Sequence, residues 1–208
     1  LTIIMNLEKL FGSKTKSDIL KYLVFRRQGV SIRALESELG RTFPGIKKQI
    51  DSLEESAVLH IDKTPERWSI KIMDEIYEEI RKLIICSLKY DTRLLLSKSP
   101  LPIKYYLGKL FEKPIDVDLV ILYSEENMGE VEQSEPIQEK VSEDLIDAMN
   151  YQVEMKVDNL DNLKKSITHL FKSYMIDPAY LVFMTHEEFN KRTKMADKFA
   201  MQILRSNQ

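Results

Sequence analysis

The first 72 residues alternate between apolar stripes at helical spacing and short polar breaks. Three stripes recur, which are formed by Ile19, Leu20, Leu23 and Val24, then by Ile32, Leu35 and Leu39, then by Ile46, Ile50 and Leu53. Gly29 and Gly40 close the first two stripes, and Ser31 stands where a helix N-cap is expected. The pattern predicts three helices, and the third covers about residues 44–56.

Two short apolar runs follow the third stripe. Residues 58–61 and 68–72 have the pattern of strands around a polar turn at 62–67. A helix-turn-helix sets its recognition helix into the DNA major groove, and a hairpin behind it forms a wing beside that helix. Residues 6–72 are therefore predicted to form a winged helix, and binding to double-stranded DNA is the first hypothesis.

Charge supports this hypothesis in one segment. Residues 9–48 contain ten basic and three acidic side chains, an excess of seven, although the whole chain has a formal net charge of -2. A positive surface is what attraction to the phosphate backbone requires. The expected contacts lie on the third helix and the wing. Base or phosphate contacts are expected from Thr42, Lys47, Lys48 and Gln49, and backbone contacts from Arg41, Lys63 and Arg67.

An amphipathic helix is predicted over residues 73–89. Its apolar stripe must be covered, so we expect it to contribute to a homodimer. The single cysteine, Cys86, has apolar neighbours and is predicted to be a buried thiol. No apolar run approaches the roughly 20 residues of a membrane span, and no secretory signal pattern is present. We therefore expect a cytoplasmic protein without membrane association.

After the prolines at 100 and 102, the pattern changes to alternating strands and helices. Strands are predicted at 103–107, 117–123, 151–157 and 179–184, and helices at 142–149, 160–174 and 186–204. The chain is thus predicted to be an α+β or α/β protein of two domains. Residues 6–90 form the winged helix with its trailing helix, and residues 91–208 form a mixed sheet with flanking helices.

Three runs in the first half resemble prokaryotic winged-helix transcriptional regulators. They are SDILKYL at 17–23, VSIRALESELG at 30–40 and IDSLEESAVL at 50–59. The resemblance covers about residues 10–90, and Ala57 stands where these families usually have glycine. It implies a winged-helix fold and DNA binding in transcription regulation, although some winged helices bind only other proteins.

Two carboxylates in the second half carry a different signal. Asp116 and Asp118 lie two residues apart in a predicted strand, so they face the same way and repel each other unless a cation lies between them. Magnesium is the expected cation. Together with Gly108 and Lys109, the pair resembles the signature of polymerase-beta-type nucleotidyltransferases. The resemblance implies nucleotide binding at Gly108 and Lys109 and catalysis by Asp116 and Asp118, with Glu154 or Asp158 as the third carboxylate.

The signature departs from the family at two points. Lys109 replaces the serine that holds phosphate, and the loop from Gly108 to Asp116 is shorter than usual. We therefore expect an inactive domain and no bound cofactor. Two alternatives stay open. One is a magnesium-dependent transfer of a nucleotide from ATP to a hydroxyl on protein, RNA or a small molecule, and the other is a protein-interaction module.

Overall fold

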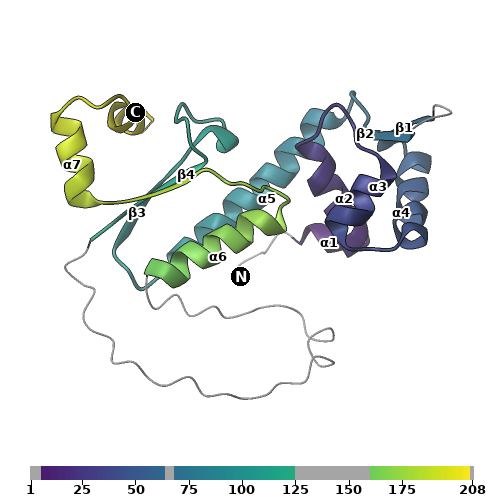
Figure 1. Ribbon diagram of the computed structural model, residues 1–208, viewed down its shortest axis with the longest axis horizontal. Coiled ribbons are helices and arrows are strands. Elements are labelled where there is room, and N and C mark those ends of the chain that lie inside the picture. Colours follow the sequence, from purple (N-terminus) through teal and green to yellow (C-terminus); the bar gives the residue numbers. More distant parts are fainter. Residues whose placement is uncertain (1–5, 64–67, 125–159, 207–208) are drawn as a thin grey trace, which may run out of the picture.

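The computed structural model describes residues 6–63, 68–124 and 160–206, and it divides into two halves that meet along a long central helix (Figure 1). The N-terminal half consists of α1 (Leu7–Phe11), α2 (Lys14–Val24), α3 (Ile32–Leu39), α4 (Phe43–Glu55), β1 (Leu59–Lys63) and β2 (Trp68–Ile72). Helices α2, α3 and α4 with the β1–β2 hairpin form the predicted winged helix, whereas α1 was not predicted.

The apolar stripes meet in one core, as their spacing predicts. Ile19, Leu35, Ile46 and Ile50 are at most 1% exposed. The hydroxyl of Ser31 accepts a hydrogen bond from the Ala34 backbone N–H (3.2 Å), so its predicted capping role is confirmed.

The wing is a regular antiparallel hairpin. Its register pairs Leu59 with Ile72 at the base and Lys63 with Trp68 toward the turn. Val30, in the turn before α3, exchanges two backbone hydrogen bonds with Ile70, at 2.9 and 2.8 Å. The hairpin is therefore fastened to the helices by main-chain bonds as well as by its apolar face.

The turn after helix α4 contains a left-handed residue, at the position where the winged-helix families that the sequence resembles usually have glycine. Ala57 has φ +55°. Its N–H donates to the Glu54 carbonyl (2.9 Å), and the Val58 N–H donates to the Leu53 carbonyl (2.9 Å), which is the Schellman pattern of a helix C-terminus. An alanine thus occupies a conformation that favours glycine.

The central helix differs from its prediction. α5 runs over Tyr77–Ser97, so it starts later than residue 73, ends later than residue 89 and continues through the expected domain boundary at residue 90. Ile84, Leu88 and Leu96 are buried within the chain. Within the described residues, no helix has the length and apolar character that crossing a bilayer requires.

The burial of α5 changes two expectations. The apolar stripe of α5 is covered within one chain, so it needs no second copy. The homodimer stays a prediction, but this stripe no longer supports it. Cys86 is exposed, so the prediction of a buried thiol is wrong. The reason is helical geometry, since Ile84, Ile85 and Leu88 face the core and Cys86 falls outside that face.

In the described residues, the second half is built on a mixed sheet of three strands, where the sequence predicted four. Its order is β3-β4-β5, with β3 antiparallel and β5 parallel to β4. Its elements are β3 (Ile103–Leu107), the 3₁₀ turn η1 (Lys109–Phe111), β4 (Leu119–Tyr123), α6 (Leu160–Ser173), β5 (Leu181–Thr185), α7 (His186–Lys194) and α8 (Lys198–Arg205). The expected helix at 142–149 and strand at 151–157 lie outside the described residues. The single helix expected at 186–204 is two helices, because Ala196 adopts φ +52° between them.

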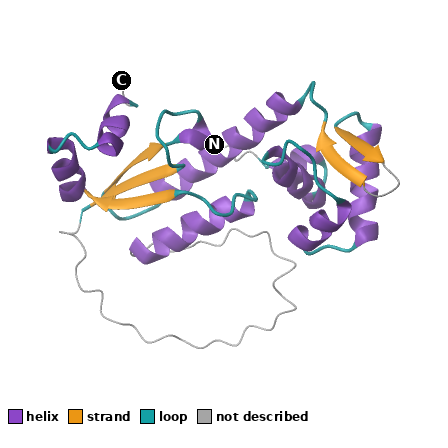
Figure 2. Ribbon diagram, turned by 45° about the horizontal axis from the view of Figure 1, so that its top comes forward, coloured by secondary structure: helices purple, strands orange, loops and turns teal. Residues whose placement is uncertain are grey.

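The two faces of this sheet pack against different helices (Figures 1 and 2). Leu119 and Ile121 belong to a core that continues through α5 and α6 into the winged helix. Val120 and Leu122 face the other way, in a smaller core with α7 and α8. The winged helix and the sheet therefore share one hydrophobic core through α5.

A buried polar cluster fastens the same junction. The Tyr174 hydroxyl donates to the Asp91 carboxylate (2.6 Å) and shares a hydrogen bond with the Ser87 hydroxyl (2.8 Å). Lys21 of α2 lies over the Tyr174 ring, with its Nζ 4.5 Å from the centroid. Burial raises the pKa of Asp91 and of Tyr174 and lowers the pKa of Lys21. The cluster joins α2 and α5 to the residue that follows α6.

The conformation of Ala57 predicts a stabilising substitution. A left-handed L-residue costs about 1–2 kcal/mol, and the extra freedom of glycine in the unfolded chain offsets about 0.4–1 kcal/mol of that. Ala57→Gly should therefore raise the free energy of unfolding by about 0.5–1 kcal/mol in urea denaturation.

Gly40→Ala is the matched control, because Gly40 also has a positive φ (+59°) and a Cβ there would meet open space. It should lower the free energy of unfolding by a similar amount. A loss of stability in Ala57→Gly would contradict the left-handed assignment.

Candidate nucleic-acid interface

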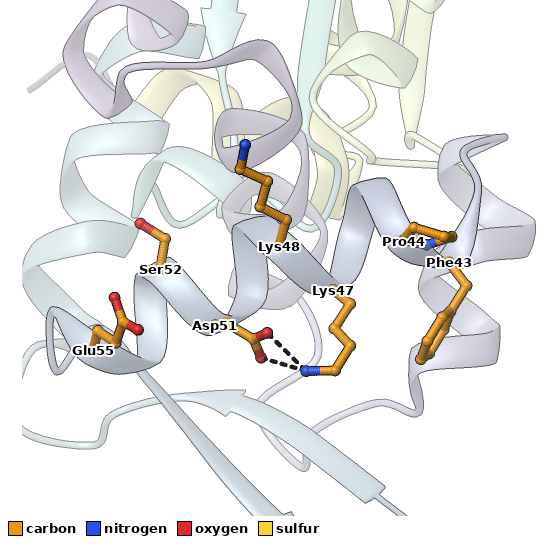
Figure 3. Close-up of a pocket in the computed structure, with 7 residues that line it drawn as sticks. All are labelled: Phe43, Pro44, Lys47, Lys48, Asp51, Ser52 and Glu55. Carbon is orange, nitrogen blue, oxygen red and sulfur yellow. Dashed lines mark hydrogen bonds and ion pairs between the residues drawn. The ribbon is translucent and has the colours of Figure 1, made fainter.

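The outward face of α4 is set by what the helix buries. Ile46, Ile50 and Leu53 point into the core, so the positions between them face solvent. A shallow depression runs along this outer face, as Figure 3 shows. It is lined by Phe43, Pro44, Lys47, Lys48, Asp51, Ser52 and Glu55.

The central side chains of this face form an ion pair. Lys47 Nζ lies 2.7 and 3.0 Å from the two carboxylate oxygens of Asp51, one helical turn further on. The two side chains are 39% and 44% exposed. Lys48 points to the other side of the helix, away from this pair (Figure 3), and is exposed. Its charge is therefore open to an incoming anion.

The start of α4 is also positive. Thr42 is the N-cap residue, its side chain makes no capping hydrogen bond, and the first turn contains no acidic residue. Unpaired N–H groups and the helix dipole give such an end a partial positive charge. This end of α4 can attract anions through its main chain.

The charges along α4 run against the helix dipole. Lys47 and Lys48 lie in the first half of the helix, whereas Glu54 and Glu55 lie in its last turn, which has no basic residue. Stability would favour the opposite order, with acids near the start and bases near the end. The arrangement lowers helix stability. Because Lys47 is paired with Asp51, Lys48 and the N-terminal end of the helix dipole supply the positive potential in the first half of α4. A local arrangement that costs stability in this way is typical of a functional surface.

Two predicted contact residues are half-buried and bonded to other parts of the fold. Gln49 Oε1 accepts a hydrogen bond from the Ser13 hydroxyl (3.3 Å), and Arg41 forms an ion pair with Asp18 (3.3 Å). Burial raises the pKa of Asp18, and the neighbouring cations Lys21 and Arg41 oppose that rise. Gln49 and Arg41 therefore attach α4 and the turn before it to α2.

The other predicted contacts differ in their surroundings. Lys63 Nζ lies 3.8 Å from Glu54 Oε1 and 5.3 Å from the centroid of the Trp68 ring. Arg67 lies outside the described residues. Sequence reasoning did not select Arg33, which is exposed in the first turn of α3. The only sequence feature that pointed to Arg33 was its position in the basic segment 9–48.

In the second half, the predicted carboxylate pair has separate partners. β4 starts at Leu119, two residues later than predicted, so Asp116 and Asp118 precede the strand. Asp118 is 4% exposed, and its Oδ2 accepts a hydrogen bond from the Tyr180 N–H (2.9 Å). Asp116 is exposed and accepts from the Gln202 side chain (2.9 Å). The prediction that both project together from the strand start is wrong.

The surroundings of the pair provide no third carboxylate in the described part of the chain. Among the residues that the structure describes, no group of three His, Cys, Asp or Glu side chains gathers to hold a metal. Glu154 and Asp158 lie outside the described residues. Magnesium binding at Asp116 and Asp118 stays a prediction.

The turn at Gly108 and Lys109 uses its own main-chain donors. The Gly108 N–H donates to the Asp118 carbonyl (2.9 Å), and the Lys109 N–H donates to the Val117 carbonyl (2.9 Å). A Cβ atom at Gly108 would overlap the Val117 oxygen, so this close approach requires glycine. Lys109 Nζ lies 4.4 Å from the centroid of the Tyr180 ring. These N–H groups are occupied within the loop.

Comparison with known proteins adds a distant likeness to a solved structure. No protein-family model matches the chain, and no curated protein sequence matches it. Among solved structures, the chain is similar to MepR, a transcription regulator of the Staphylococcus aureus multidrug efflux pump MepA. The identity is 17%, the match covers 45% of this chain and 73% of MepR, and the TM-score is 0.39. The winged-helix assignment therefore rests on the elements and the register of this chain.

The bonds of Asp118 predict a structural role that can be tested. Asp118→Ala removes the acceptor of a part-buried N–H, so the free energy of unfolding should fall by about 1–3 kcal/mol without added metal. Asp116→Ala, the matched control, removes an exposed carboxylate and should change the free energy of unfolding by less than about 0.5 kcal/mol.

The same denaturation series with Mg²⁺ tests the metal site. A rise in wild-type stability with Mg²⁺ that both substitutions abolish would show that the two carboxylates hold a cation. That result would contradict the structural role.

Proposed function

We propose that the protein is a DNA-binding transcription regulator that presents α4 to the major groove and the β1–β2 wing to the flanking backbone. The observation that carries this proposal is the order of charges along α4. Positive groups lie at the exposed start of the helix and acids at its end, although this order lowers the stability of the helix.

The proposal gives each exposed group a role. In helix-turn-helix proteins, the N-terminal residues of the recognition helix contact base edges. Thr42, Lys47 and Lys48 lie in that part of α4, while Glu54 and Glu55 lie at the far end, where they meet fewer phosphates. Arg33 and Lys63 would contact phosphates on either side. Arg41 and Gln49 would act indirectly, by holding α4 in place.

Assembly and location follow from this role as predictions. A homodimer would present two α4 helices to half-sites about one helical turn apart, or a multiple of that. Its interface would have to lie elsewhere than on the stripe of α5, which is buried within the chain. Binding to DNA would agree with the cytoplasmic location that the sequence predicts.

For the second half we propose a supporting role without nucleotide transfer. Lys109 stands in place of the phosphate-holding serine, and its N–H is used within the loop. The two carboxylates have separate partners. The shared core and the Tyr174 cluster would make this half a rigid base for α2.

Salt-dependent binding tests the proposed function. The wild type should bind random duplex DNA with a steep loss of affinity between 50 and 200 mM salt, because each neutralised phosphate releases counterions. Lys48→Ala should weaken binding and make the slope of log K against log salt shallower by about 0.9. Fluorescence anisotropy of a labelled duplex measures both quantities.

Lys98→Ala is the charge-matched control, because Lys98 is also exposed but follows α5, far along the chain from α4. It should leave the slope unchanged. If the wild type does not bind duplex DNA even at low salt, the regulator proposal is wrong and the protein-interaction alternative takes its place.

A further inference from the structure

The Lys47–Asp51 pair presents a donor and an acceptor side by side at the centre of the proposed DNA-binding face. Both side chains line the depression on α4, and both are partly exposed (Figure 3). The ammonium can donate, and the carboxylate can only accept. Any molecule that replaces this ion pair must therefore offer acceptors to Lys47 and a donor to Asp51.

Helix stability does not account for the pair. An ion pair one turn apart stabilises a helix more when the acid precedes the base, and here Lys47 precedes Asp51. The exposure of both side chains also makes the contribution of the pair to folding small. Its position on the outer face is better explained by what binds there.

The pair also lowers attraction to phosphate. Asp51 neutralises Lys47 and would repel a phosphate that approached it. A helix selected only for general DNA affinity would not have an acid at this position. Asp51 therefore limits binding to DNA that offers its carboxylate a hydrogen-bond donor.

One base pair matches this requirement in the major groove. A G·C pair presents two adjacent acceptors, N7 and O6 of guanine, followed by a donor, the N4 amino group of cytosine. Lysine commonly contacts those guanine atoms, and aspartate accepts from cytosine N4. In an A·T pair, the adenine amino group lies between two single acceptors, adenine N7 and thymine O4, so the pair does not offer Lys47 two adjacent acceptors beside the donor for Asp51.

We propose that Lys47 and Asp51 together read one G·C base pair, with Lys47 on guanine and Asp51 on cytosine. This inference rests on the proposed DNA binding and adds a sequence preference to it. In free protein the two groups satisfy each other. On a matching site they exchange that contact for the base edges, and on other sequences Asp51 stays against Lys47 or faces a phosphate.

Selection from a randomised duplex library tests the proposal. The wild type should enrich duplexes with one position fixed as G·C. Asp51→Ala should reduce the preference at that position about tenfold or more. It should also raise affinity for random duplex and steepen the salt slope by about 0.9, because Lys47 becomes free to contact phosphate.

Glu55→Ala is the matched control, since Glu55 lies one turn beyond Asp51 on the same face. It removes the same charge and should keep the G·C preference. Circular dichroism of both variants checks that the helix is intact. If duplexes bind but Asp51→Ala keeps the preference, the base-reading proposal is wrong while DNA binding stands. If the wild type binds no duplex at low salt, both are wrong.

Discussion

The burial of Ile46, Ile50 and Leu53 is the constraint on which the proposed DNA-binding face depends. These three side chains fix the rotation of α4 about its axis. That rotation turns Lys47, Lys48 and Asp51 outward and leaves the start of the helix accessible. The hydrogen bond between Lys16 and Ser52 (2.8 Å) links the same helix to α2. The face is thus a consequence of core packing.

The support of this face extends into the second half of the chain. Helix α5 belongs to the same core as the winged helix and the sheet. The Tyr174 cluster brings a lysine of α2 to an aspartate of α5, and each desolvated group there has a hydrogen-bond or cation–π partner. Removing one member of such a cluster leaves its partners unsatisfied, so the junction behaves as a unit.

The spacing of residues close together in the sequence predicted the winged helix. The predictions that failed depended on contacts between residues far apart in the sequence. The three helices and the Ser31 cap follow from spacing within about ten residues. The roles of Arg41 and Gln49 depend on Asp18 and Ser13, which no local pattern brings close. Alternation placed Asp116 and Asp118 on one face of a strand, but the strand begins at Leu119, and Asp118 bonds to Tyr180 from a distant segment.

If the outer face of α4 contacts DNA, backbone amide chemical shifts measured by NMR should follow it during a duplex titration. The largest changes should fall on residues 42–51, with smaller changes at Arg33 and Lys63 and none in α7 and α8. Changes confined to α7, α8 or β5 on adding duplex would contradict this contact.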